Sequence, residues 1–242
     1  MFDFTDNQKV NGVRILAILA ILSMMLYAPE LWISTKDFPV IPLFDWIPIP
    51  TSPFDSILAG VFFMSQVIYL FKPKRWLGWL VFLQYVLLSM IDQNRLQPYF
   101  YQSALTIFAI VLYKEKTAAK KVLYTVILIF LATYFWSGVQ KLNGIFYEEW
   151  MGALLKHFSF VPEVLLQVFT YAVPWLEALL GIFLLFNKTR RLGVLGVVAM
   201  HSIIIVMLLY LGYGFNVIPW NVQNILSVLI IFWVLETNSV FD

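Results

Sequence analysis

Three residues in or beside apolar segments carry the chemistry that this sequence offers, namely Lys141, Glu177 and His201. A charge at bilayer depth costs at least about 2.5 kcal/mol on insertion scales, so each needs a structural or functional reason. Glu177 precedes Phe186 by nine residues, and His201 follows Leu192 by nine. At about 1.5 Å of rise per residue, both lie about 13–14 Å from the same end of their helices, near the membrane midplane.

The loop of residues 187–191 is short, so the helices that carry Glu177 and His201 should be antiparallel neighbours. We therefore expect a hydrogen bond or ion pair between these two side chains. Two interpretations stay open. The pair is either a polar bridge that holds two helices together, or a group with a catalytic, proton-relay or ligand-binding role.

Lys141 ends a run that reads Tyr134-Phe-Trp-Ser-Gly-Val-Gln-Lys-Leu-Asn143. Tyr134, Ser137, Gly138 and Lys141 follow the spacing i, i+3, i+4, i+7 and so share one helix face. The small residues of this face allow another helix to approach closely. Lys141 is either an anchor that extends to the interface or a lysine that faces a cavity. Desolvation in a cavity would favour the neutral amine, which can act as a base.

Two further segments are dense in polar groups. Residues 91–99 include Asp92 and Arg95, which could pair, and residues 216–224 place several amides beside Pro219. The first segment is either a capped, solvated turn or part of a site. The amides of the second either satisfy backbone groups freed near the proline or face the same site as Lys141. We expect these elements to converge on one polar, aromatic-rimmed pocket.

Composition restricts the class of protein. The chain is 61% hydrophobic and 12% charged, whereas soluble domains are about 45–50% apolar and about 25% charged. Contact with lipid explains the deficit of charge. A net charge of +2 gives no case for nucleic acid as a partner. The absence of cysteine excludes thiolate chemistry and Cys-ligated metals, and two histidines with no metal motif predict no metal site.

Apolar runs of about 17–25 residues are typical of membrane-spanning helices. The sequence predicts eight of them, at residues 13–32, 54–71, 76–91, 98–113, 122–140, 164–186, 192–211 and 219–235. We therefore expect an all-α, polytopic integral membrane bundle in which residues 1–242 form a single transmembrane domain. Ser52 and Pro53 fit the N-cap and first position of the second helix.

The connecting loops differ sharply in basic residues. Twelve of the sixteen lysines and arginines fall on one side: Lys9, Arg14, Lys72, Lys74, Arg75, Lys114, Lys116, Lys120, Lys121, Lys188, Arg190 and Arg191. The other side has only Lys36, Arg95, Lys141 and Lys156. The positive-inside rule predicts that both termini are cytoplasmic, and we expect the bacterial inner membrane.

The non-cytoplasmic side holds the irregular segments. Residues 34–53 contain five prolines among aromatic residues, which indicates either an interfacial loop or a lid over a cavity. Residues 141–163 suit a helix that lies in the interface.

The run 134–143, followed by Trp150, resembles a stretch of the HTTM family, the bacterial membrane relatives of vitamin K-dependent γ-glutamyl carboxylase. Glu177, the segment Thr189–Gly193 and then His201 follow in the order seen in that family. The resemblance covers about residues 10–235, and the DoxX-like group of quinone-linked membrane proteins is a neighbouring possibility.

The resemblance implies a site for a lipid quinone on the non-cytoplasmic side. It implies Lys141 as the base, with Tyr99, His201 and Glu177 as further catalytic candidates. Trp136, Asn143, Trp220 and Asn221 are the implied cofactor-binding residues. Tyr99 is a departure, because Gln97-Pro98-Tyr99 stands where the carboxylase has Asn-His. The large outer domain of the carboxylase is missing, so glutamate carboxylation is not expected.

Two classes of function follow. The first is an enzyme that acts on a lipid quinone or a similar apolar small molecule. The alternative is a non-enzymatic subunit for partner binding, immunity or assembly, whose polar residues only hold helices together and whose protein partner the sequence does not identify. A transporter is less favoured, because the sequence shows no inverted repeat.

Overall fold

The computed structural model describes residues 4–33, 36–113 and 119–233, and in these ranges the regular structure is entirely helical. The helices are α1 (Asp6–Tyr27), α2 (Phe54–Phe71), α3 (Arg75–Ile91), α4 (Pro98–Leu112), α5 (Ala119–Val139), α6 (Gly144–His157), α7 (Glu163–Leu185), α8 (Arg190–Leu211) and α9 (Ile218–Val228). Short helical turns are η1 (Pro29–Trp32), η2 (Gln93–Arg95) and η3 (Phe215–Val217), and a π-helical turn, η4 (Leu229–Trp233), continues α9.

The helices confirm the predicted all-α membrane bundle. Among the described residues, α1, α2, α5, α7, α8 and the segment 215–232 are long and apolar enough to cross a bilayer. Helices α3 and α4 are apolar but have 17 and 15 residues. Together these eight segments coincide with the eight predicted spans. The first begins earlier than predicted, at Asp6, because Thr5 and Gln8 form a capping box there.

Two details at helix starts differ from the sequence prediction or complete it. Ser52 does not cap α2: the N-cap residue is Pro53, and no side chain caps this helix. A helix, α6, is present in the segment that we expect to lie in the interface, and Asn143 caps it by accepting a hydrogen bond from Phe146 N at 2.9 Å.

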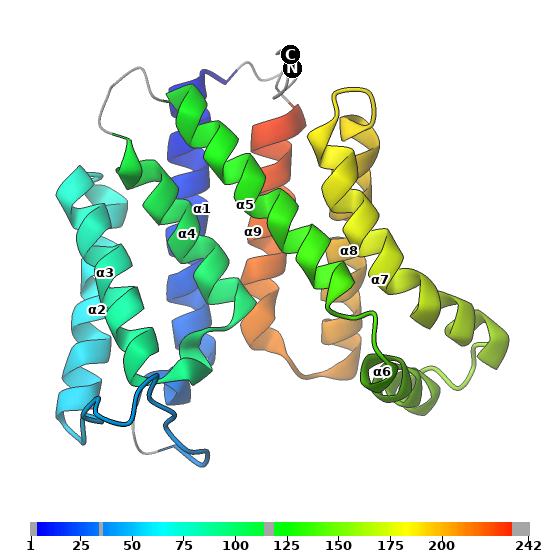
Figure 1. Ribbon diagram of the computed structural model, residues 1–242, viewed down its shortest axis with the longest axis horizontal. Coiled ribbons are helices and arrows are strands. Elements are labelled where there is room, and N and C mark those ends of the chain that lie inside the picture. The colour runs from blue at the N-terminus through cyan, green and yellow to red at the C-terminus, as the bar shows by residue number, and fades with distance from the viewer. Residues whose placement is uncertain (1–3, 34–35, 114–118, 234–242) are drawn as a thin grey trace.

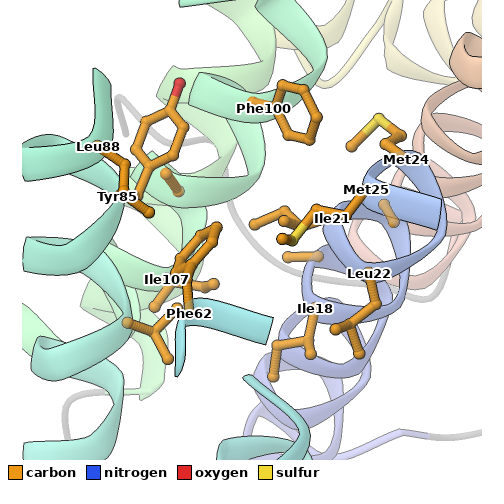
Figure 2. Close-up of a cluster of buried hydrophobic side chains, with 14 of the residues drawn as sticks. Ile18, Ile21, Leu22, Met24, Met25, Phe62, Tyr85, Leu88, Phe100 and Ile107 are labelled. Carbon is orange, nitrogen blue, oxygen red and sulfur yellow. The ribbon is translucent and has the colours of Figure 1, made fainter. Parts of the chain in front are cut away.

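The bundle has two packed halves that share α1. In the first half, side chains from α1, α2, α3 and α4 converge on a core that includes Ile21, Phe62 and Phe100, as Figure 2 shows. The second core gathers residues of α5, α8 and α9, including Phe130 and Val197. Helix α1 contacts α4 on one side and α5 and α9 on the other. Helix α1 therefore joins the two halves, and α4 joins them as well through its contact with α5 (Figure 1).

Helices α5 and α7 make the closest crossing that bears on the site. A Cβ atom at Gly138 would lie 2.3 Å from the Pro174 carbonyl oxygen and 2.6 Å from Ala178 N. On α7, a Cβ at Gly181 would lie 2.9 Å from the Leu131 carbonyl oxygen. Glycine on both helices lets the two backbones touch. The close approach predicted at Gly138 is confirmed.

Two buried arginines, Arg14 and Arg190, and the exposed Arg75 lie at the end of the bundle where α1 begins and α2, α4 and α7 end (Figure 1). Arg14 Nη1 donates to Tyr69 O at 2.8 Å, and Arg190 Nε donates to Leu184 O at 3.2 Å. Arg75, which is exposed, donates from Nε to Val111 O at 2.7 Å. Each of the three cations Arg14, Arg75 and Arg190 satisfies carbonyl groups at the C-terminal end of a helix, where the helix dipole favours positive charge.

At the opposite end, the proline-rich loop is fixed to the turn after α3. The predicted pair between Asp92 and Arg95 is wrong. Asp92 forms an ion pair with Lys36, which comes from the loop. Arg95 donates instead to the carbonyl oxygens of Leu31 at 2.8 Å and Leu88 at 2.9 Å. Burial lowers the pKa of the Arg95 guanidinium, and the Asp92 charge opposes this effect.

The crossing of α5 and α7 predicts a sharp difference between two glycines. Gly138→Ala should lower the free energy of unfolding by about 1–3 kcal/mol, because the new methyl group forces the two backbones apart. Gly60→Ala in α2 is the matched control, since a Cβ there meets nothing within 4 Å and alanine favours a helix. Thermal unfolding in detergent measures both. Equal melting temperatures for wild type and Gly138→Ala would contradict the close packing.

Candidate functional site

One face of α5 organises the polar residues of the second half. Tyr134 and Gly138 are buried, and Ser137 and Lys141 are half-buried. The spacing of these four residues placed them on one face, and the structure directs that face toward α7, α8 and α9. Two separate polar clusters result, one around Glu177 and one around His201.

The first cluster lies between α5 and α7. The Lys141 ammonium forms an ion pair with the Glu177 carboxylate. Lys141 also donates to Ser137 Oγ at 3.0 Å, and Ser137 Oγ donates to Glu177 Oε2 at 2.7 Å. The side chains are 25% exposed for Lys141 and 11% for Glu177. Lys141 is therefore a hydrogen-bond donor to both partners, which is the role of an ammonium.

The second cluster surrounds His201, which is fully buried in α8. Its Nδ1 lies 2.6 Å from Asn221 Oδ1 on α9, and its Nε2 lies 3.1 Å from the Tyr134 hydroxyl on α5. The Asn221 amide nitrogen donates to Val217 O at 2.8 Å, so the amide oxygen is the atom that faces the ring. Nδ1 must then carry a proton and donate it to Asn221.

The predicted contact between Glu177 and His201 is wrong. The two residues lie on neighbouring helices, but each turns to a different part of α5: Glu177 bonds Ser137 and Lys141, and His201 bonds Tyr134. The physical reason is the glycine crossing at Gly138, which brings α5 against α7. A third helix therefore supplies the partners that the short loop suggested the pair would give each other.

The His201 cluster continues toward α4. The Tyr134 hydroxyl also lies 2.9 Å from Asn224 Oδ1, so its single proton has two alternative acceptors, this oxygen and His201 Nε2. Gln102 Nε2 donates to the same amide oxygen at 2.9 Å. Trp220 Nε1 donates to Gln102 Oε1 at 2.7 Å. The sequence prediction missed Gln102, although its place in an otherwise apolar run was a signal. A continuous hydrogen-bonded network thus joins α4, α5, α8 and α9.

A groove of about 620 Å³ lies between α4 and α5. Four of the predicted site residues line it: Tyr99, Trp136, Lys141 and Trp220. The other four do not: Glu177 lies beside Lys141 on α7, His201 and Asn221 are buried in their network, and Asn143 caps α6. The prediction of one pocket is therefore only partly correct.

The proline-rich loop does not act as a lid over this groove, since none of its described residues, 36–53, lines it. In the described part of the chain, no three His, Asp or Glu side chains gather in a way that could hold a metal ion. The site thus consists of an ion pair, a neutral network and a groove.

The ion pair predicts non-additive effects of two substitutions. Lys141→Met should lower the free energy of unfolding by about 2 kcal/mol, because it leaves the Glu177 carboxylate poorly compensated in a largely buried position. The double variant Lys141→Met/Glu177→Gln should recover at least half of that loss. Denaturant unfolding in detergent measures the cycle, and Lys156→Met, at an exposed position, is the control. Additive losses in the double variant would show that the two groups do not interact.

Comparison with protein families gives a match over part of the chain. Residues 119–219, from the start of α5 to the start of α9, match the family model described as methylamine utilisation protein MauE. Comparison with curated proteins and with solved structures gives no match.

This match overturns the resemblance to the HTTM family. The residues that carried the resemblance, 134–143, Glu177 and His201, all lie in the segment that matches MauE. Nothing in the comparisons supports a carboxylase-like or DoxX-like protein. The physical reason is that the motif describes packing: Gly138 permits a helix crossing, and Arg190 caps the carbonyl end of α7. Such features recur in unrelated membrane bundles.

Proposed function

We propose that this integral membrane protein is an accessory subunit that binds a protein partner and is not itself an enzyme. The observation that carries the proposal is that Glu177 and His201 are both engaged by side chains of the same bundle. Both ring nitrogens of His201 are hydrogen-bonded, and the Glu177 carboxylate is bound by Lys141 and Ser137. Polar groups engaged in this way hold helices together.

The MauE match supports an accessory role. The matched segment contains the Glu177 cluster, all of α6, and Tyr134 and His201 of the second cluster. Its family is described by a process, methylamine utilisation. We extend that process to this chain as part of the proposal. The lipid quinone and the base role of Lys141 stay predictions, and a base role would require Lys141 to leave Glu177.

Helix α6 is the element best suited to meet a partner. Of its 14 residues only Leu154 is buried, and Ile145 is 70% exposed. A helix of this length gains most of its stability from packing an apolar face, so α6 needs a surface outside the chain. The membrane interface can supply part of that surface, and a partner can supply the rest.

Crosslinking distinguishes these surfaces. A photo-crosslinking residue at Ile145, in the tagged full chain expressed in its native membrane, should form an adduct with one protein of defined mass. The same residue at Leu195, which is 52% exposed on α8, is the control and should react with lipid. The partner should also co-purify at a fixed ratio in mild detergent.

A chain that purifies alone and reacts only with lipid at both positions would contradict the partner proposal. Oxidation or reduction of an added quinone by that chain would favour the enzyme instead.

We also propose the orientation that charge predicts, with the loop of residues 187–191 in the cytoplasm. The sequence contains no cysteine, so a single introduced cysteine reports on its own position. An impermeant maleimide should label Ser159→Cys in intact cells and Lys188→Cys only after permeabilisation, since both sites are exposed but lie at opposite ends of the bundle. The reverse pattern would invert the topology.

A further inference from the structure

The groove between α4 and α5 has one end at Thr125 and the other at Lys141. At the Thr125 end, the Tyr113 hydroxyl lies 3.0 Å from Thr125 Oγ1 and bridges the two helices. Trp220 of α9 also lines the groove. Its lining residues Leu105, Leu128 and Trp136 are exposed on the outside of the bundle, so the groove opens sideways, toward the space that the bilayer occupies.

The groove has the size and length of a site for an elongated molecule. Its volume of about 620 Å³ lies within the range of about 300–1,000 Å³ that is usual for small-molecule sites. Thr125 and Lys141 are sixteen residues apart on α5 and the turn that follows it, so the groove extends over about 24 Å at about 1.5 Å per residue. That length is comparable to most of a hydrocarbon core of about 30 Å.

The chemistry of the wall changes along this length. Leu128 and Ile129, one turn from Thr125 on α5, and Leu105 on α4 give an apolar surface. Gln140 and Lys141 line the other end, beyond α5, and Tyr99 at the start of α4 lies at that end as well. An occupant that matches both parts has an apolar chain and a polar head.

The end of the groove at Tyr99 and Lys141 offers hydrogen-bond donors. The Lys141 ammonium has three N–H groups, and the described structure engages them with Ser137 and Glu177, which leaves one for a ligand. The Tyr99 hydroxyl accepts a hydrogen bond from Asn216 Nδ2 at 3.4 Å, so its own proton is free to be donated. The head of the occupant must therefore present acceptor oxygens.

The Trp220 side of the groove offers no hydrogen-bond donor to a ligand. Trp220 lines the groove, but its Nε1 already donates to Gln102. The indole thus offers an apolar ring to the groove, and an acyl chain packs well against such a surface. An empty groove would lose these van der Waals contacts, because its lining residues would have no neighbouring atoms on that side.

We propose that this groove is a binding site for a phospholipid from the leaflet on the Lys141 side. One acyl chain lies along α4 and α5 against Trp220, and the phosphate and ester oxygens accept hydrogen bonds from Lys141 and Tyr99. The occupant comes from the bilayer because the groove opens into it. Its head group is rich in acceptor oxygens, which complement the donors of Lys141 and Tyr99.

Native mass spectrometry of the full chain, purified in detergent and titrated with phosphatidylethanolamine, tests this site. Wild type should retain one lipid. Ala132→Phe should weaken retention at least about tenfold, or about 1.4 kcal/mol, because the ring fills the groove. Ala199→Phe is the matched control on the exposed surface of α8 and should retain the lipid as wild type does. Leu105→Trp is a second groove-filling variant if Ala132→Phe fails to fold.

Two results would overturn the proposal. Equal retention by Ala132→Phe and Ala199→Phe, both folded by their melting curves, would show that the lipid is not in the groove. Preferential retention of ubiquinone from an equimolar mixture with phosphatidylethanolamine would assign the groove to a quinone instead. Tyr99→Phe adds a check on the head group and should weaken retention about threefold, in line with the loss of one hydrogen bond.

Discussion

The bilayer interior offers no hydrogen-bond partners, and this constraint shapes the second half of the bundle. His201, Tyr134 and Asn224 can be buried there because each supplies what another lacks: a ring nitrogen, a hydroxyl and an amide oxygen. Glu177 can be buried because Lys141 reaches it from α5. Helix α5 is the common partner in both clusters, so the positions of α7, α8 and α9 all depend on it.

Basic residues serve two purposes at the end of the bundle where α1 begins. Arg14, Arg75 and Arg190 belong to the set whose distribution predicts a cytoplasmic end, yet each also binds carbonyl oxygens at the end of a helix. Arg95 performs the same task for α3 at the opposite end. Capping therefore explains some of the arginines on both sides. The asymmetry that remains lies mainly in the lysines, which makes them the better topological signal.

The sequence could predict distances along helix axes but not directions around them. Periodicity located the spans and the shared face of α5, and it identified Gly138 as a crossing point. Equal depth suggested that Glu177 and His201 meet, but depth fixes one coordinate and leaves rotation about the axis free. The partner of Asp92 likewise came from a distant loop, through Lys36. Such contacts depend on which helices pack together, and a single sequence does not encode that plainly.

The proposed partner surface and the lipid groove meet at the end of α5. Lys141 lines the groove, and Asn143, two residues later, caps α6 through Phe146 N. Helix α6 in turn contacts α7, where the Tyr147 and Tyr171 rings lie 4.8 Å apart, and α7 carries Glu177. A displacement of α6 would therefore reach Lys141 both through the chain and through its ion pair. In the proposed accessory role, the lipid and the partner would both contact the same short segment.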